Sequence, residues 1–230
     1  MQKEIYDLSG VLRKAGVMRK YAGCLSVKGN YRKKNQDRAC CLSSSKKGIL
    51  FAVGCVCDGI GSFAQSEIAA EMIRVGIERW FLGMEPLYPE NIDEESLIDD
   101  LDMTIRELNE LIWIYRKENG IDIGCTMSLL VLLNKKYHVF HVGDSKILLI
   151  DDRVSQITKD EVSVVERDGK LKTLLANFMG KVEELSSFPE NDYTDEGQLV
   201  GHIVMGAIKL DRLIREIPGF PPKLANEVKH

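Results

Sequence analysis

An aspartate follows directly on an apolar run in the first third of the chain. The run 48–57 consists of apolar, β-favouring and small residues, and it ends at Asp58, which Gly59 and Gly61 follow. A carboxylate at the end of a buried strand is costly unless something stabilises it, and the glycines allow the backbone to approach a ligand closely. Carboxylate and carbonyl oxygens suit a hard cation such as Mg²⁺ or Mn²⁺. Taken alone, the pattern also fits an ordinary turn.

Two further aspartates stand in comparable positions. Asp144 follows Gly143 between two apolar segments, and Asp37 ends a polar segment that contains Arg32. Carboxylates at sheet edges with an arginine nearby are the groups needed for metal-assisted attack on a phosphate, because metals activate water and a guanidinium holds phosphoryl oxygens by two parallel hydrogen bonds. Each motif alone also fits a turn or a surface ion pair. Their joint occurrence favours phosphoryl chemistry.

The composition is that of a soluble globular protein and argues against some classes of binding partner. Hydrophobic residues make up 44% and charged residues 29% of 230 residues, which fits one large domain. The net charge of -4 gives no reason to expect a nucleic-acid partner. The longest apolar runs, such as 129–133, are too short to span a membrane, and Lys3, Glu4 and Asp7 interrupt any signal peptide. We therefore expect a cytoplasmic protein without a membrane partner.

The cysteines and two histidines could also bind a metal ion. Their spacing in the sequence argues against such a site. No Cys-x-x-Cys pair occurs, and most of the cysteines lie in apolar runs, so we expect reduced, buried thiols. His138 and His141 are three residues apart on a predicted strand, so they point to opposite faces and cannot easily share an ion. The six cysteines are Cys24, Cys40, Cys41, Cys55, Cys57 and Cys125.

The elements that position these residues follow from hydrophobic periodicity. Apolar residues from Ile68 to Phe81 fall on one helical face, and a second amphipathic helix is predicted for 93–119, closed by Gly120. The acidic residues at the start of the second helix complement its dipole, so they are not taken as a cation site. Strands are predicted at 21–27, 38–42, 48–57, 125–133, 137–142, 146–151 and 154–157. This order predicts an α+β domain with helices packed on sheets.

Five short motifs occur in the order found in one enzyme family. They are Arg32-x-x-Asn35-Gln36-Asp37, Val56-Cys57-Asp58-Gly59-Ile60-Gly61 with Glu67-Ile68-Ala69 following, Gly124-Cys125-Thr126, Val142-Gly143-Asp144-Ser145, and Gln156-Ile157-Thr158-Lys159-Asp160. The sequence resembles the metal-dependent serine/threonine protein phosphatases of the PPM (PP2C) family, particularly its bacterial members. A weaker echo at 175–180 extends the resemblance over about residues 21–180.

The resemblance implies a fold and a set of site residues. The fold would be a β-sandwich of two antiparallel sheets flanked by helices, in four αββα layers, with a binuclear Mn²⁺ or Mg²⁺ centre at one end. Asp58 would bridge the two metals, and Gly59 would offer its carbonyl to one of them. Asp37 would support the metal water shell, and Arg32 would bind the substrate phosphate. Asp144 matches a position that helps to hold a third, weaker ion in some members.

Three positions near these motifs depart from the family pattern. Ser62 replaces the last glycine of the usual Asp-Gly-x-Gly-Gly, a change that a turn could absorb. Ile60 stands where some members carry a histidine proposed as general acid, so the leaving group would be protonated by water or another group. Glu161 stands where a histidine often follows the Thr-x-Asp element, and the sequence assigns it no role.

The C-terminal third departs further. The family supplies two more metal aspartates there, one in a Ser-Asp-Gly and one in an Asp-Asn pair, and this sequence has neither. Asp168-Gly169 is the only later Asp-Gly and lies in a charged segment. Asp192, Asp195 and Asp211 have the wrong surroundings. The apolar pattern from Leu199 onwards predicts a helix that ends near 218.

These observations give a domain division and two functional hypotheses. We expect an N-terminal extension at 1–20, a phosphatase domain at 21–196 and a divergent tail at 197–230. The first hypothesis is an enzyme that hydrolyses phosphoserine and phosphothreonine esters by attack of a metal-bridged water. Its partners would be a phosphorylated protein substrate and, as a candidate, a cognate serine/threonine kinase. The second is a catalytically silent phosphatase-like domain that binds a phosphoprotein or another partner.

Overall fold

The computed structural model describes residues 6–7, 23–28, 33–133, 136–150, 154–167, 170–181 and 202–206. Arg32, the proposed phosphate ligand, lies outside these ranges. The remaining C-terminal aspartates considered above, Asp168, Asp192, Asp195 and Asp211, lie outside them as well.

A four-stranded antiparallel sheet forms the centre of the molecule. Its strand order is β3-β4-β5-β6, so consecutive strands are neighbours. The bounds are Arg38–Lys46 for β3, Ile49–Cys57 for β4, Met127–Leu133 for β5 and Lys136–Val142 for β6. Alternate residues of β4, such as Phe51, Val53 and Cys55, are buried in the main core. The four strands predicted for this part of the chain are therefore confirmed, whereas the strand predicted at 21–27 is present only at Gly23–Cys24.

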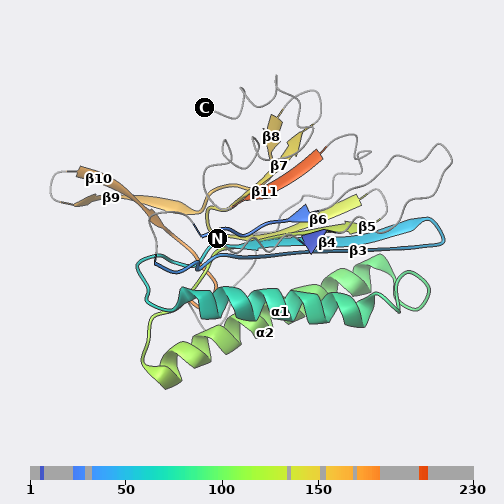
Figure 1. Ribbon diagram of the computed structural model, residues 1–230, viewed down its shortest axis with the longest axis horizontal. Coiled ribbons are helices and arrows are strands. Elements are labelled where there is room, and N and C mark those ends of the chain that lie inside the picture. The colour runs from blue at the N-terminus through green and yellow to red at the C-terminus, as the bar shows by residue number, and fades with distance from the viewer. Residues whose placement is uncertain are drawn as a thin grey trace.

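Two long helices cover one face of this sheet (Figure 1). They are α1, Ser66–Met84, and α2, Glu94–Asn119. The Asp93 side chain accepts a hydrogen bond from the Ser96 backbone at 2.8 Å, and Gly120 ends α2 in the left-handed conformation at φ 60°. The buried faces contain Ile73, Ile77, Leu101 and Ile105, at the spacing expected for amphipathic helices, and complete the main core with the sheet.

A smaller sheet packs on the other face of the central sheet (Figure 1). It contains β7, Lys146–Ile150, between β8, Val154–Gln156, and β11, His202–Gly206. A β-carbon placed on Gly54 of β4 would lie 3.1 Å from the Met205 sulfur, so the two sheets are in close contact. The helix predicted from Leu199 onwards is therefore wrong at 202–206. The β-branched Ile203 and Val204 suit the strand, which pairs with β7 over its full length.

Two short antiparallel pairs lie outside these sheets. The hairpin β9, Val162–Arg167, and β10, Lys170–Leu175, projects from the body of the molecule (Figure 1). This hairpin was not predicted, although Asp-Gly, a common hairpin signal, stands between its two strands in the sequence. In the second pair, β1, Tyr6–Asp7, joins β2, Gly23–Cys24. The weak helical pattern of the sequence at 1–20 is thus not followed at Tyr6 and Asp7, which form a strand.

The chain has an α+β fold with antiparallel sheets and packed helices, as predicted. Helices, central sheet and smaller sheet form three of the four expected layers. A second helical layer has no counterpart within the ranges that the structure describes. No helix in those ranges is both long and apolar enough to cross a membrane. The domain boundaries stay predictions.

Candidate metal-binding site

One edge of the central sheet places two of the predicted site residues, Asp37 and Asp58, in a row with Gly143, the neighbour of Asp144. The strand registers pair Arg38 with Cys57, Val56 with Ser128, and Met127 with Val142. Continuing these registers past the strand ends places four residues side by side, in the order Asp37, Asp58, Thr126 and Gly143. Because residues opposite each other in antiparallel strands project to the same face, Asp37 and Asp58 are positioned to act together.

Asp58 is held through its backbone. Its N–H donates to Thr126 Oγ1 at 3.0 Å, and the Thr126 N–H donates to the Asp58 carbonyl at 2.9 Å. Beyond it, the Ile60 N–H donates to the Gly124 carbonyl at 3.1 Å. These bonds extend the pairing of β4 with the β5 segment past the end of β4 and fix the start of the Asp58 side chain.

The loop that carries Asp37 packs directly on Gly59. A β-carbon at Gly59 would lie 2.6 Å from the Gln36 carbonyl oxygen and 3.0 Å from the Ser66 β-carbon. The Gln36 side chain donates to the Phe63 carbonyl at 2.9 Å. Only glycine permits this approach, which explains why a glycine follows Asp58 and brings the Asp37 loop against it.

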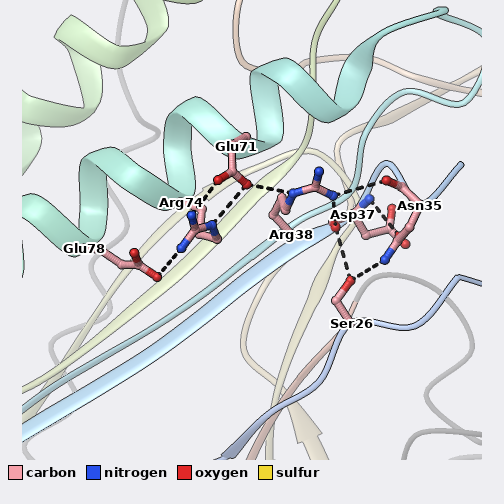
Figure 2. A network of polar contacts seen from close by, with 7 residues as sticks. All are labelled: Ser26, Asn35, Asp37, Arg38, Glu71, Arg74 and Glu78. Carbon is pink, nitrogen blue, oxygen red and sulfur yellow. Dashed lines mark hydrogen bonds and ion pairs between the residues drawn. The ribbon is translucent and has the colours of Figure 1, made fainter. Parts of the chain in front are cut away.

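A polar network ties the Asp37 loop to Ser26, which follows β2, and to helix α1 (Figure 2). Ser26 Oγ accepts from Asn35 at 2.8 Å and donates to the Asp37 carbonyl at 3.2 Å. Arg38 donates to the same carbonyl at 2.9 Å and to Glu71 on α1 at 2.7 Å. The hydrogen bond from Arg74, together with that from Arg38, lowers the pKa of Glu71. Arg38 is thus engaged in holding the loop.

The Gly143–Asp144 turn is held by Glu161, the residue to which the sequence assigned no role. The Glu161 carboxylate accepts from the Gly143 N–H at 2.9 Å, and the Glu161 N–H donates to the Gly143 carbonyl at 2.7 Å. Gly143 has φ 111°, and a β-carbon there would lie 2.6 Å from Thr126 Cγ2. Asp144 is half-buried beside this contact. Glu161 therefore fixes the backbone that presents Asp144.

The weak echo at 175–180 also packs at this edge. Met179 forms a bridge with Cys125, its N–H donating to the Cys125 carbonyl at 2.8 Å. The Gly180 N–H donates to the buried Asn109 side chain of α2 at 2.7 Å. A β-carbon at Gly124 would lie 2.6 Å from the Phe178 ring. This segment supports the backbone next to Thr126.

The expectations for histidines and cysteines are confirmed. His138 contacts Glu94 at 3.1 Å on the helix side of the sheet, whereas His141 contacts Ser128 at 2.9 Å on the other face. All six cysteines are free thiols, and four of them are buried.

The donors near Asp58 suit a hard cation, but the described residues provide only part of a cage. Asp58, Asp37 and the Gly59 carbonyl are oxygen donors of the type that Mg²⁺ and Mn²⁺ take. Within the described ranges, no three acidic, histidine or cysteine side chains are grouped closely enough to hold a metal ion. Asp144 is therefore not joined with Asp37 and Asp58 into such a cluster. Further ligands would have to come from residues outside these ranges or from water.

The comparison with family models decides the family. Residues 31–170 match the protein phosphatase 2C family. The chain belongs to that family. The matched region includes every element of the row at the sheet edge and the proposed ligand Arg32. No curated protein matches this phosphatase 2C chain.

Solved structures show the same fold. A mutated bacterial serine phosphatase is 23% identical with a TM-score of 0.52, and the match covers 70% of this chain and 65% of that one. The serine/threonine phosphatase Stp1 from Staphylococcus aureus is 20% identical with a TM-score of 0.56, and the match covers 70% of this chain and 66% of that one. This phosphatase 2C chain thus spans somewhat less than two thirds of either phosphatase.

Proposed function

We propose that this chain is a metal-dependent serine/threonine protein phosphatase. The observation that carries the proposal is the placement of Asp37 opposite Asp58 at one sheet edge, in a chain of the phosphatase 2C family. The proposed substrate is a phosphoserine or phosphothreonine ester in a protein. A cytoplasmic location and an opposing serine/threonine kinase are parts of the same proposal.

Three residues are proposed to hold two Mn²⁺ or Mg²⁺ ions, and a fourth is proposed to hold a third ion. Asp58 would bridge them, Gly59 would provide its carbonyl, Asp37 would hold the water shell, and Asp144 would serve a third, weaker ion. The ions, when bound, supply Lewis acidity that activates water and neutralises phosphate charge. The oxygen donors of the row fit these ions by chemical type.

The protein's own residues would position the carboxylates and bind the phosphate. Thr126 holds the Asp58 backbone, and Glu161 holds the turn at Gly143, so the carboxylates start from fixed positions. Arg32 would hold the phosphoryl oxygens by two parallel hydrogen bonds. Ile60 has no proton to give, so the departing serine or threonine oxygen would take its proton from water or another group.

A silent phosphatase-like domain is the second candidate. It is favoured by the lack of a group of three metal-ligating side chains within the described ranges. One or two carboxylates hold Mg²⁺ weakly, because the ion keeps most of its waters. Such a domain would still bind a phosphoprotein through Arg32.

The test is Mn²⁺-dependent hydrolysis of an aryl phosphate and of a phosphothreonine peptide. Asp58→Asn should lower the rate by ~100-fold or more, beyond the 10- to 100-fold typical for losing a residue that only supports a metal ligand. Asp99→Asn makes the same chemical change at an exposed position on α2 and should leave the rate unchanged. Phosphopeptide binding without metal-stimulated hydrolysis by the folded wild-type protein would favour the silent domain.

A further inference from the structure

His141 is buried between the two sheets, in contact with the turn that carries Asp144. Only 5% of its surface is exposed. Its Nε2 lies 3.0 Å from the Gly143 carbonyl oxygen and 3.1 Å from the Lys159 carbonyl oxygen. On the opposite side of the ring, Nδ1 lies 2.9 Å from Ser128 Oγ. Both ring nitrogens are thus engaged.

These partners determine the tautomer. Carbonyl oxygens only accept hydrogen bonds, so the proton at that side of the ring is on Nε2. Burial lowers the pKa of His141, so the ring is neutral and Nδ1 is an acceptor. The single Ser128 hydroxyl proton is then shared between two acceptors, His141 Nδ1 at 2.9 Å and the Ser145 carbonyl oxygen at 3.0 Å. The Ser145 carbonyl, 3.0 Å from Ser128 Oγ, has a second donor in the Thr158 hydroxyl at 3.3 Å.

A chain of buried hydroxyl groups leads from His141 to Asp58. Ser128 contacts the Ser145 carbonyl, and Ser145 Oγ lies 2.7 Å from Thr126 Oγ1. Thr126 Oγ1 in turn accepts the Asp58 N–H at 3.0 Å. Ser128, Ser145 and Thr126 are each at most 2% exposed. Because such buried groups have no water to replace a lost partner, removal of one should disturb its neighbours.

The His141 ring also holds the Gly143–Asp144 turn. The Gly143 carbonyl receives hydrogen bonds from His141 and from the Glu161 backbone, and the Gly143 N–H is bound by the Glu161 carboxylate. The residue after Gly143 is Asp144. His141 therefore contacts the segment that carries Asp144 at the Gly143 carbonyl, and it is linked to Asp58 through Ser128, the backbone and hydroxyl of Ser145, and Thr126.

We propose that His141 is a positioning residue for metal binding, which orients Asp58 through Ser128, Ser145 and Thr126 and orients Asp144 through the Gly143 carbonyl. The proposal rests on the proposed phosphatase function for its metal. It assigns His141 no contact with substrate and no proton transfer. Such hydrogen bonds would orient the candidate ligands as neighbouring carboxylates and carbonyls orient metal ligands in other proteins.

The chain offers a matched control on the same strand. His138 lies on the opposite face of β6 and contacts Glu94, away from the row at the sheet edge. His138→Ala removes the same side chain as His141→Ala. His141→Gln keeps an N–H donor near the place of Nε2 but loses the acceptor at Nδ1, so it should restore the contact with Gly143 alone.

The first measurement is Mn²⁺ binding by calorimetry. His141→Ala should weaken Mn²⁺ binding by ~10-fold or more, the scale seen when support for a metal ligand is lost, and His141→Gln should recover part of it. His138→Ala should bind as the wild type does. Equal Mn²⁺ affinity in the folded His141→Ala, His138→Ala and wild-type proteins would overturn the proposal.

A second measurement separates this proposal from the proposed function. Amide hydrogen exchange without metal should become faster at Asp58 and Thr126 in His141→Ala, relative to His138→Ala, even if the chain hydrolyses nothing. His141→Gln should speed exchange at Asp58 more than at Asp144. Unchanged exchange at both sites would refute the positioning role. A wild-type protein that neither binds Mn²⁺ nor hydrolyses phosphate would refute the proposed function, while exchange still tests the network.

Discussion

Gly59 packs so closely on Gln36 that a β-carbon at Gly59 would lie 2.6 Å from the Gln36 carbonyl oxygen. This approach brings the loop with Asp37 against the turn with Asp58. The loop is tied to the segment after β2 by Ser26 and to α1 by Arg38 (Figure 2), so it has little freedom to move away. The spacing of the two carboxylates therefore depends on the absence of a side chain at Gly59.

Gly59→Ala should displace the Asp37 loop and separate the two carboxylates. We expect Mn²⁺ affinity to fall by ~10-fold or more and the free energy of unfolding to fall by ~1–3 kcal/mol, the usual cost of overpacking. Calorimetry and urea unfolding measure the two effects. Gly83→Ala in α1 is the control, since a β-carbon there meets nothing within 4 Å and alanine favours the helix. A Gly59→Ala protein with wild-type metal affinity would contradict this account.

Ser66→Ala should stabilise the protein. The Ser66 hydroxyl is fully buried at the start of α1 and has no hydrogen-bond partner among the residues that the structure describes. Removing an unpaired buried hydroxyl should raise the free energy of unfolding by ~1 kcal/mol. Ser145→Ala is the comparison, because the Ser145 hydroxyl is equally buried but paired with Thr126, and its loss should destabilise by ~1–3 kcal/mol. A loss of stability in Ser66→Ala would show that the hydroxyl has a partner.

Acid should destabilise the fold through His141. Burial lowers the pKa of His141, against smaller opposing effects from Glu161, the Lys159 and Gly143 carbonyls, and Asp160. The unfolded chain then binds the proton more readily than the folded chain, so stability is full above about pH 6.5 and falls as the pH drops below it. Urea unfolding between pH 7.5 and pH 5 should show this loss, and His141→Asn should reduce the slope. An identical pH dependence in the variant would assign the loss to other groups.

The thiols should react slowly in the folded protein. Burial raises the pKa of Cys41 to about 11 and that of Cys24 to about 12, although both are only half-buried. At pH 8 less than about one Cys41 thiol in a hundred is then ionised, and the thiolate is the reactive form. Titration with a disulfide reagent should find little reaction before unfolding and six thiols after it. Rapid modification of one native cysteine would identify a site with a different environment.

The sequence predicted the elements with a clear period and the edge at which the motifs meet. Both long helices and the central strands followed from the spacing of apolar residues. The motifs that contain Asp37, Asp58 and Gly143 stand at strand ends in the sequence, and the strand registers bring these three residues into one row. The strand at 202–206 was taken for a helix because Ile203 and Met205 fit both periods over so short a segment. The hairpin at 162–175 was missed because its many charged residues concealed the alternation.

The polar supports of the site could not be found from local pattern. Ser128 and His141 lie on different strands, and only the register of β5 with β6 makes them partners. Glu161 is 18 residues from Gly143, and the fold of the intervening segment brings them together. A signal was present in retrospect: Thr126 and Ser128 alternate with apolar residues in an otherwise apolar strand, which marks one face of its end as polar.

The alternation of β4 has a consequence for how faithfully Asp58 is placed. Phe51, Val53, Cys55 and Cys57 face the helices, so every even-numbered residue up to Asp58 faces the smaller sheet. A slip of one residue in the register would turn this carboxylate toward the helices and at the same time expel four core side chains from the interior. A misregistered chain would lose its stability together with its site. Burial of the hydrophobic core thus also selects the register that places the Asp58 carboxylate correctly.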